Sequence, residues 1–129
     1  MNPIKTFDKD GEQTGVLATI WHEDTGPVIS QVYLTTVLAR KVKGPHLHMK
    51  RRGLFSCVRG EVIVVTRIAG KYITNSLKLG DPPLKVPPGV PAALYNPNGI
   101  EALVLNMPDP PWRVGEEDEH EIKDWSWKP

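Results

Sequence analysis

Residues 44–65 of the chain read GPHLHMKRRGLFSCVRGEVIVV. Two runs within and just beyond this stretch, 54–58 and 61–68, are rich in β-branched and large apolar residues, which favour strands. Only Arg59 and Gly60 separate the two runs, and a short loop with glycine is typical of a β-hairpin. The stretch therefore predicts two antiparallel strands that follow directly after a histidine pair.

The rest of the chain repeats this pattern of short runs and sharp breaks. Further strand-like runs lie at 16–21, 28–39, 72–79, 92–95 and 100–105. Turn signals rich in Gly, Pro and Asn separate them, and the chain holds 11 Gly and 13 Pro. No segment of helical length carries an apolar stripe of period 3.6 with caps. We therefore predict an all-β protein, an antiparallel sandwich or barrel.

The composition excludes several classes of protein. With 129 residues, 40% hydrophobic and 24% charged, the chain suits a single globular domain over residues 1–129. A formal net charge of +1 disfavours nucleic acid as a partner, since duplex-binding domains carry a clear basic excess. The one cysteine, Cys57, excludes an internal disulfide framework and a cysteine-rich zinc site.

The sequence predicts neither a membrane span nor a signal peptide. Residues 1–15 read MNPIKTFDKDGEQTG and lack the apolar core of a signal peptide. No run of about 20 apolar residues is present. We therefore expect a cytoplasmic protein that has no membrane partner.

Both ends of the chain differ from its strand-rich middle. Residues 1–14 are polar and predict an N-terminal arm or a first edge strand. Residues 107–129 hold Trp112, Trp125 and Trp127, together with an acidic cluster at 116–121. A solvated acidic loop would account for the cluster, but three indoles are too large and apolar to be left in water. We expect this Trp-rich, acidic tail to pack on the barrel or on a second subunit.

The histidine pair of the opening stretch is the richest point in chemistry. If the chain is extended there, residues two apart share a face, so that His46, His48 and Lys50 point the same way. Such a row suits an exposed surface, and it also suits the polar wall of a pocket. We favour the pocket because basic residues concentrate around it. They are Arg40, Lys41, Lys43, Lys50, Arg51, Arg52 and Arg59.

The same residues bear on the kind of ligand. A local basic field beside a pocket suits a phosphorylated or diphosphate ligand, whose oxygens arginine binds in a bidentate manner; a basic surface without a ligand is the alternative. A His-x-His pair can supply two ligands to a metal ion, but a third is needed. His48 is followed by Met-Lys-Arg-Arg, and added cations disfavour a divalent ion. We predict a base and binding residues here, with no metal and no cofactor.

Two motifs of the sequence resemble those of the cupin superfamily. The first is the opening stretch, which supplies His46, His48 and Gly60. The second is the segment 80–96, GDPPLKVPPGVPAALYN, which supplies Gly80, Pro87, Gly89 and Asn96. The family's usual glutamate ligand falls at Arg52 or Gly53 and its usual second-motif histidine at Ala92, so two of four metal ligands are missing. The resemblance implies an antiparallel jelly-roll (cupin) barrel in a single domain.

Within the cupins, the chain most resembles the dTDP-4-dehydrorhamnose 3,5-epimerase group and its 3,4-ketoisomerase relatives. The likeness includes the hairpin LFSCVRGEVIVV and the tail PDPPWRVGEEDEHEIKDWSW. It implies an enzyme, a homodimer, that epimerises or isomerises a nucleotide-linked 4-keto-6-deoxysugar without metal. The sequence keeps two alternatives open: a metal-dependent cupin enzyme, with tail ligands such as His120 or Glu119, and a cupin that only binds a ligand.

The resemblance also implies roles for single residues. His46 corresponds to the general base, and Glu119 or Asp124 of the tail would orient it. Lys50 or His48 would stabilise the enolate oxygen. The family's usual tyrosine acid has no counterpart in the tail, so Tyr95 or Tyr33 would have to replace it, and we expect Tyr95 to be catalytic with His46 and His48. The expected substrate-binding residues are Lys50, Arg51, Arg52, Arg59, Tyr33 and Trp112.

Overall fold

The computed structural model of the chain is built from antiparallel β-strands, and it describes residues 3–20, 29–111 and 113–129. The strands of these residues are β1 (Ile4–Phe7), β2 (Gln13–Leu17), β3 (Tyr33–Val37), β4 (Val42–His46), β5 (Gly53–Arg59), β6 (Glu61–Ile68), β7 (Lys71–Lys78), β8 (Leu84–Val86), β9 (Ala92–Tyr95) and β10 (Ala102–Asn106). No helix of the described residues is long and apolar enough to span a membrane.

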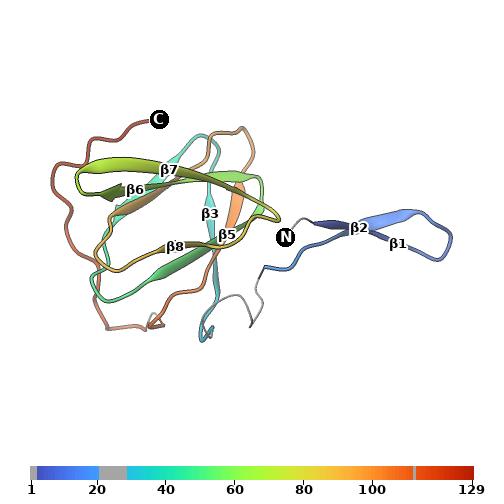
Figure 1. Cartoon of the computed structure of the whole chain (residues 1–129), viewed down its shortest axis with the longest axis horizontal. Coiled ribbons are helices and arrows are strands. Elements are labelled where there is room, and N and C mark those ends of the chain that lie inside the picture. Colours follow the sequence, from blue (N-terminus) through green and yellow to red (C-terminus); the bar gives the residue numbers. More distant parts are fainter. Residues whose placement is uncertain (1–2, 21–28, 112) are drawn as a thin grey trace.

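Eight of these strands form two four-stranded sheets that face each other (Figure 1). One sheet has the order β3-β10-β5-β8 and the other the order β4-β9-β6-β7. Every strand pair is antiparallel. The prediction of an all-β, antiparallel fold of the cupin type in one domain is confirmed.

The core lies between the two sheets and takes residues from both. Val62 and Val64 of β6 are fully buried, and they meet Val104 of β10 and Cys57 of β5 in one cluster. Strand β6 is central in its sheet, between β7 and β9, and the facing sheet, with β5 and β10, covers these side chains. Alternate residues of a strand point to the same face, so the run EVIVVTRI needs a covered face and folds as a central strand.

Both strands of the opening stretch form, as β5 and β6, with Gly60 at the turn between them. The prediction that they make a hairpin is wrong, because β5 pairs with β10 and β8 in one sheet and β6 pairs with β7 and β9 in the other, so the chain crosses between the sheets at Gly60. The φ angle of Gly60 is 72°, a left-handed conformation that a residue with a Cβ adopts at a cost. A Cβ at this position would also lie 3.4 Å from the Cα of Ala102. A Cβ at this distance would make an ordinary van der Waals contact, so glycine is favoured here by the φ angle rather than by lack of space.

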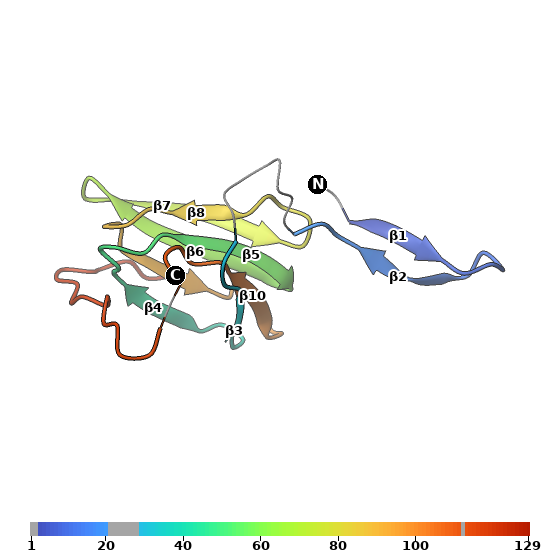
Figure 2. The same cartoon turned by 90° about the horizontal axis from the view of Figure 1, so that it is seen from below.

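The two ends of the chain behave differently. Strands β1 and β2 pair with each other and project away from the sandwich as a separate hairpin (Figure 1 and Figure 2). The C-terminal tail instead runs back along the sandwich. The ring centroids of Trp125 and Tyr72 are 5.0 Å apart in an edge-to-face arrangement, and those of Trp127 and Tyr95 are 5.8 Å apart. The side chain of Arg67 also stacks on Trp125 and donates to the tail carbonyls of residues 123 and 124.

Candidate active site

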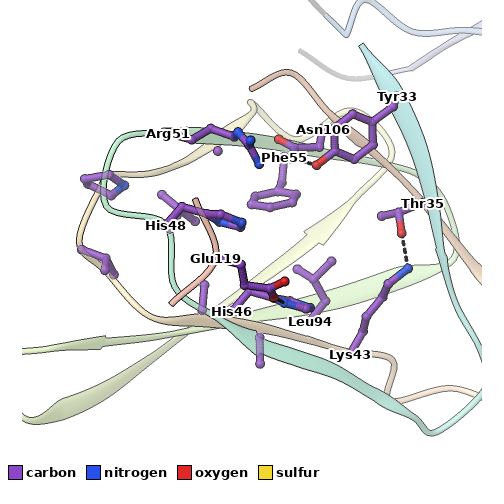
Figure 3. A pocket seen from close by; sticks show the side chains of 16 residues that line it. Tyr33, Thr35, Lys43, His46, His48, Arg51, Phe55, Leu94, Asn106 and Glu119 are labelled. Carbon is purple, nitrogen blue, oxygen red and sulfur yellow. Dashed lines mark hydrogen bonds and ion pairs between the residues drawn. The ribbon is translucent and has the colours of Figure 1, made fainter. Parts of the chain in front are cut away.

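A cavity of about 650 Å³ opens between the two sheets. Its volume lies in the range of roughly 300–1,000 Å³ that is typical of small-molecule sites. Apolar side chains that include Phe55, Val86, Val90 and Leu94 form part of its lining, and several of them belong to or pack on the hydrophobic core. The polar lining residues are Tyr33, Thr35, Lys43, His46, His48, Arg51, Asn106 and Glu119 (Figure 3). The cavity thus combines an apolar floor with a few converging polar groups.

His46 is paired with a carboxylate that comes from the tail. It is the last residue of β4, and its Nδ1 forms a hydrogen bond with Oε1 of Glu119 (Figure 3). This hydrogen bond from His46 is the largest cause that lowers the pKa of Glu119, and partial burial opposes it. Because an ionised carboxylate only accepts hydrogen bonds, the shared proton belongs on Nδ1, and in the neutral imidazole the other ring nitrogen, Nε2, is then an acceptor.

His48 lies beside His46 and is held in its neutral form. The two ring centroids are 6.4 Å apart and the ring planes differ by 17°. Burial lowers the pKa of His48 below its ordinary value, and the nearby Arg51 guanidinium lowers it further; Asp118 and Glu119 oppose the shift. His48 is therefore neutral near pH 7, with one nitrogen that donates and one that accepts a hydrogen bond.

Arg51 brings to the cavity wall a positive charge that forms no ion pair within the described residues. The residue is only 9% exposed, and its Nε is buried without a hydrogen-bond partner in the described part of the chain. No carboxylate among residues 3–20, 29–111 and 113–129 forms an ion pair with it. A buried charge is stable only when it is paired, so Arg51 is poised to receive an anionic group of a ligand.

Tyr33 and Asn106 form a fixed pair on the other sheet. The amide oxygen of Asn106 accepts the backbone N–H of Leu54 at 3.1 Å, which directs its Nδ2 toward the Tyr33 hydroxyl at 2.7 Å. The hydroxyl oxygen accepts this bond, so its own proton is free to be donated into the cavity. Tyr33 belongs to β3 and His46 to β4, which lie in different sheets. The hydroxyl and the imidazole therefore approach the cavity from different walls (Figure 3).

Four of the predicted site residues share this cavity: His46, His48, Arg51 and Tyr33. Lys50 does not line it, because β4 ends at His46 and the chain turns, so that the two-residue alternation does not reach position 50. Trp112 lies outside the described residues.

The remaining predicted residues are engaged elsewhere in the structure. Arg52 is buried against the tail, where it donates to the carbonyl of Met107 and lies 3.7 Å from the carboxylate of Asp109. Arg59 is exposed at the end of β5, and Tyr95 packs against Trp127. None of these three lines the cavity.

Sequence reasoning missed several lining residues. Thr35 is two positions after Tyr33 on β3, so the alternation rule would have found it. Lys43, whose Nζ donates to the Thr35 hydroxyl, stands out in the sequence only as part of the basic segment. Asn106 carries no local signal, because its role depends on Leu54 and Tyr33, which are 52 and 73 residues away in sequence.

Of the two tail ligands of the metal-dependent alternative, Glu119 reaches the histidine pair and His120 does not line the cavity. No group of three His, Cys, Asp or Glu that could hold a metal ion lies within the residues that the structure describes. Glu119 is bonded to His46, while the ring of His120 is half-exposed and lies 3.4 Å from the Asp118 carboxylate. The second-motif position holds Ala92, which lines the cavity and has no ligating atom.

Solved structures of known proteins share this fold. The dTDP sugar isomerase of Desulfovibrio desulfuricans G20 matches with a TM-score of 0.77 and 22% identity, over 94% of this chain and 80% of that chain. NovW, a 4-keto-6-deoxy sugar epimerase of Streptomyces spheroides, matches with a TM-score of 0.69 and 18% identity, over 93% and 66%. The capsular polysaccharide assembling protein CapF of Staphylococcus aureus matches with a TM-score of 0.63 and 18% identity, over 73% of this chain and only 26% of CapF.

Sequence comparison places the chain in a family. No curated protein sequence matches it. Residues 2–123 match the family described as "FdtA: WxcM-like, C-terminal". This match and the shared fold confirm the predicted resemblance to the cupin sugar epimerases and isomerases. The chain belongs to the FdtA, WxcM-like C-terminal family.

Proposed function

We propose that the protein is a metal-independent isomerase of a nucleotide-linked 4-keto-6-deoxysugar, with His46 as the general base. The observation that carries the proposal is the His46–Glu119 pair on the wall of the cavity. A carboxylate on Nδ1 selects the tautomer in which Nε2 can accept a proton. Membership of the FdtA family and a dTDP sugar isomerase of the same fold support the substrate class.

The proposed reaction moves the keto group by one carbon. His46 removes the proton from carbon 3, which the neighbouring carbonyl at carbon 4 makes acidic. The C–H electron pair then forms a C3=C4 double bond, while the carbonyl π pair moves onto oxygen 4, which takes up a proton. Loss of the proton from oxygen 3 and protonation of carbon 4 give the 3-keto isomer. Atoms and electrons balance, so the step needs no oxidant or reductant.

His48 and Arg51 support this chemistry from the same wall. A neutral His48 accepts a proton at one nitrogen and donates at the other, so it carries a proton between oxygens 3 and 4. Arg51 would receive the diphosphate, whose oxygens match the guanidinium. The apolar floor, with Phe55 and Leu94, would contact the sugar ring or the base.

Epimerisation is the second candidate, and Tyr33 favours it. The same enolate gives an epimer when carbon 3 is reprotonated from the opposite face. Tyr33 has a free hydroxyl proton and approaches from the sheet opposite to that of His46. NMR analysis of the product distinguishes the two reactions, because isomerisation moves the carbonyl carbon and epimerisation only inverts a centre.

The test of the proposed function is proton exchange in heavy water. The protein is incubated with dTDP-, UDP- and GDP-linked 4-keto-6-deoxysugars, and the products are followed by NMR. We expect deuterium at carbon 3 or 4 with at least one nucleotide, and unchanged rates after treatment with a chelator. Absence of exchange at carbons 3 and 4 with all of them would overturn the proposal.

Two further measurements separate the alternatives. A stoichiometric transition metal in elemental analysis, together with loss of exchange after chelation, would support a metal-dependent cupin. A rise in melting temperature with a nucleotide sugar, but without turnover, would support a binding protein.

We also propose that the protein is a homodimer. An isolated two-stranded hairpin is at best marginally stable in water, yet β1–β2 projects from the sandwich (Figure 2). Its Ile4, Phe7, Val16 and Leu17 are all more than half exposed. A second copy of the chain would cover this apolar surface.

Replacement of Phe7 by lysine is expected to weaken the dimer, because a charge would be placed in the buried contact. Light scattering should give the mass of a dimer for the wild-type protein and a mass shifted toward a monomer for Phe7→Lys. The matched control is Ile68→Lys, which alters an exposed apolar residue of β6 outside the hairpin. A monomeric wild-type protein, or a Phe7→Lys protein that stays fully dimeric, would contradict the proposal.

A further inference from the structure

A second tail carboxylate, next to Glu119, is bound by the backbone of the segment that follows the histidines. The Asp118 carboxylate accepts N–H groups from Met49 at 3.1 Å, Lys50 at 3.0 Å and Arg51 at 2.9 Å. A further bond links the Lys50 N–H to the other carboxylate oxygen at 3.2 Å. Both oxygens of Asp118 are thus bound by three consecutive residues.

This contact is built as an anion site that the chain itself fills. Successive backbone N–H groups that converge form a concavity that binds anions. The Asp118 side chain is only 9% exposed. Burial alone would raise the pKa of Asp118, but the hydrogen bonds from Lys50, Arg51 and Met49 outweigh it and hold this pKa below its ordinary value. The carboxylate therefore remains ionised, and its bonds stay charge-assisted, at neutral pH.

Asp118 is joined to the histidine pair through its neighbours. We call residues 118–120 the acidic strap. Within it, Glu119 forms a β-bridge with His48, and the N–H of His120 donates to the carbonyl of Leu47 at 2.9 Å. These backbone contacts fix the direction of the strap, and the Asp118 carboxylate holds it against residues 49–51. The side chain of Glu119 then meets His46.

We infer that Asp118 is a positioning residue, which acts on His46 by holding Glu119 at its Nδ1. This inference rests on the proposed function, because the reaction uses His46 as the base. Asp118 does not line the cavity that holds His46, so it acts on the base through the strap. Loss of its bonds would free the strap, and the proton of His46 would no longer be confined to Nδ1.

The sharpest variant is Asp118→Asn, which keeps the size of the side chain. Its amide has one oxygen, so its NH₂ group must face a backbone N–H of Met49, Lys50 or Arg51, donor against donor. The matched control is Glu117→Gln, which makes the same charge change at an exposed neighbour. Asp118→Ser, whose hydroxyl accepts one N–H, is the second variant in case Asp118→Asn does not fold.

The first measurement is ¹⁵N NMR of the histidine rings, with His46→Asn used to assign the signals. We expect His46 to carry its proton on Nδ1 in the wild-type protein and in Glu117→Gln. In Asp118→Asn the proton should move in part to Nε2. An unchanged tautomer in Asp118→Asn, or a wild-type protein without the Nδ1–H form, would overturn the inference. The tautomer of His46 can be measured without turnover, so this experiment tests the inference even if the proposed reaction is wrong.

The second measurement is a double-variant cycle of exchange rates. Asp118→Asn should lower kcat by about tenfold with little change in KM, as for residues that support a catalytic group from outside. Glu119→Gln should lower kcat at least as much. The double variant should have the same kcat as Glu119→Gln alone, because both changes act through one contact. A double variant whose loss of kcat equals the product of the two single losses would overturn the inference.

Discussion

Deuterium uptake at carbon 3 is expected to be abolished when His46 is replaced by asparagine. A positioned general base contributes about 10²–10⁴-fold to a rate, so we expect a loss of about a thousandfold. The asparagine amide can still donate to Glu119, but it offers no basic nitrogen. The change thus removes the base and keeps the contact of the acidic strap. NMR in heavy water, at saturating nucleotide sugar, measures the rate.

Binding and stability are the controls for this experiment. The His46→Asn protein should bind the nucleotide sugar with nearly wild-type affinity by calorimetry, since Arg51 and the apolar floor are unchanged. Its melting temperature should stay close to that of the wild-type protein, because the His46 side chain is 47% exposed. Full exchange activity in this variant would remove His46 from the mechanism.

Replacement of Arg51 by glutamine is expected to have the largest effect on binding. A hydrogen bond to a charged group contributes about 1.5–3 kcal/mol, which corresponds to a roughly ten- to hundredfold change in affinity. In the free protein the same change should leave stability equal or higher, because it removes a buried charge whose Nε has no partner in the described residues. Weaker binding without loss of stability identifies a group that is kept for a ligand.

Calorimetry with the nucleotide sugar and thermal unfolding of the free protein measure the two effects. The matched control is Arg40→Gln, an exposed position outside the cavity, which should bind as the wild-type protein does. Wild-type affinity in Arg51→Gln would show that the anionic group of the ligand lies elsewhere.

The sequence predicted the strands that depend on local patterns. The run at 92–95 coincides with β9, and the run at 61–68 with β6, because β-branched residues between strong turn signals leave little freedom. Strand β4 was not among the predicted runs, because it contains Gly44 and Pro45, which normally interrupt strands. Strand β8 has three residues between prolines and depends on pairing with β5. Both are edge strands. Their extended conformation depends on pairing with a neighbouring strand, and their own sequences do not predict it.

The site was predictable as far as the motif reached. His46, His48 and Arg51 come from one segment, and the structure places them on the same cavity. The extension of alternation to Lys50 failed because the chain leaves β4 after His46. The sequence could name Glu119 only as one of two tail carboxylates. The choice between Glu119 and Asp124 depends on where residues 118–120 attach, which is a matter of backbone hydrogen bonds rather than of residue type.

The tail that carries Glu119 also sets how the site would be lost. Beyond β10 the described residues form no strand. The tail is held by isolated bridges, by hydrogen bonds such as those of the Asp118 carboxylate and the Arg67 side chain, and by two aromatic contacts. Of the described residues beyond β10, only Met107 and Pro108, directly after the strand, are buried, and the hydrophobic cluster between the sheets includes neither of them. Segments held by few buried apolar contacts open locally at a free energy below that of global unfolding. Inactivation by mild denaturant would therefore precede unfolding of the sandwich, with the folded but inactive molecule as a separate thermodynamic state.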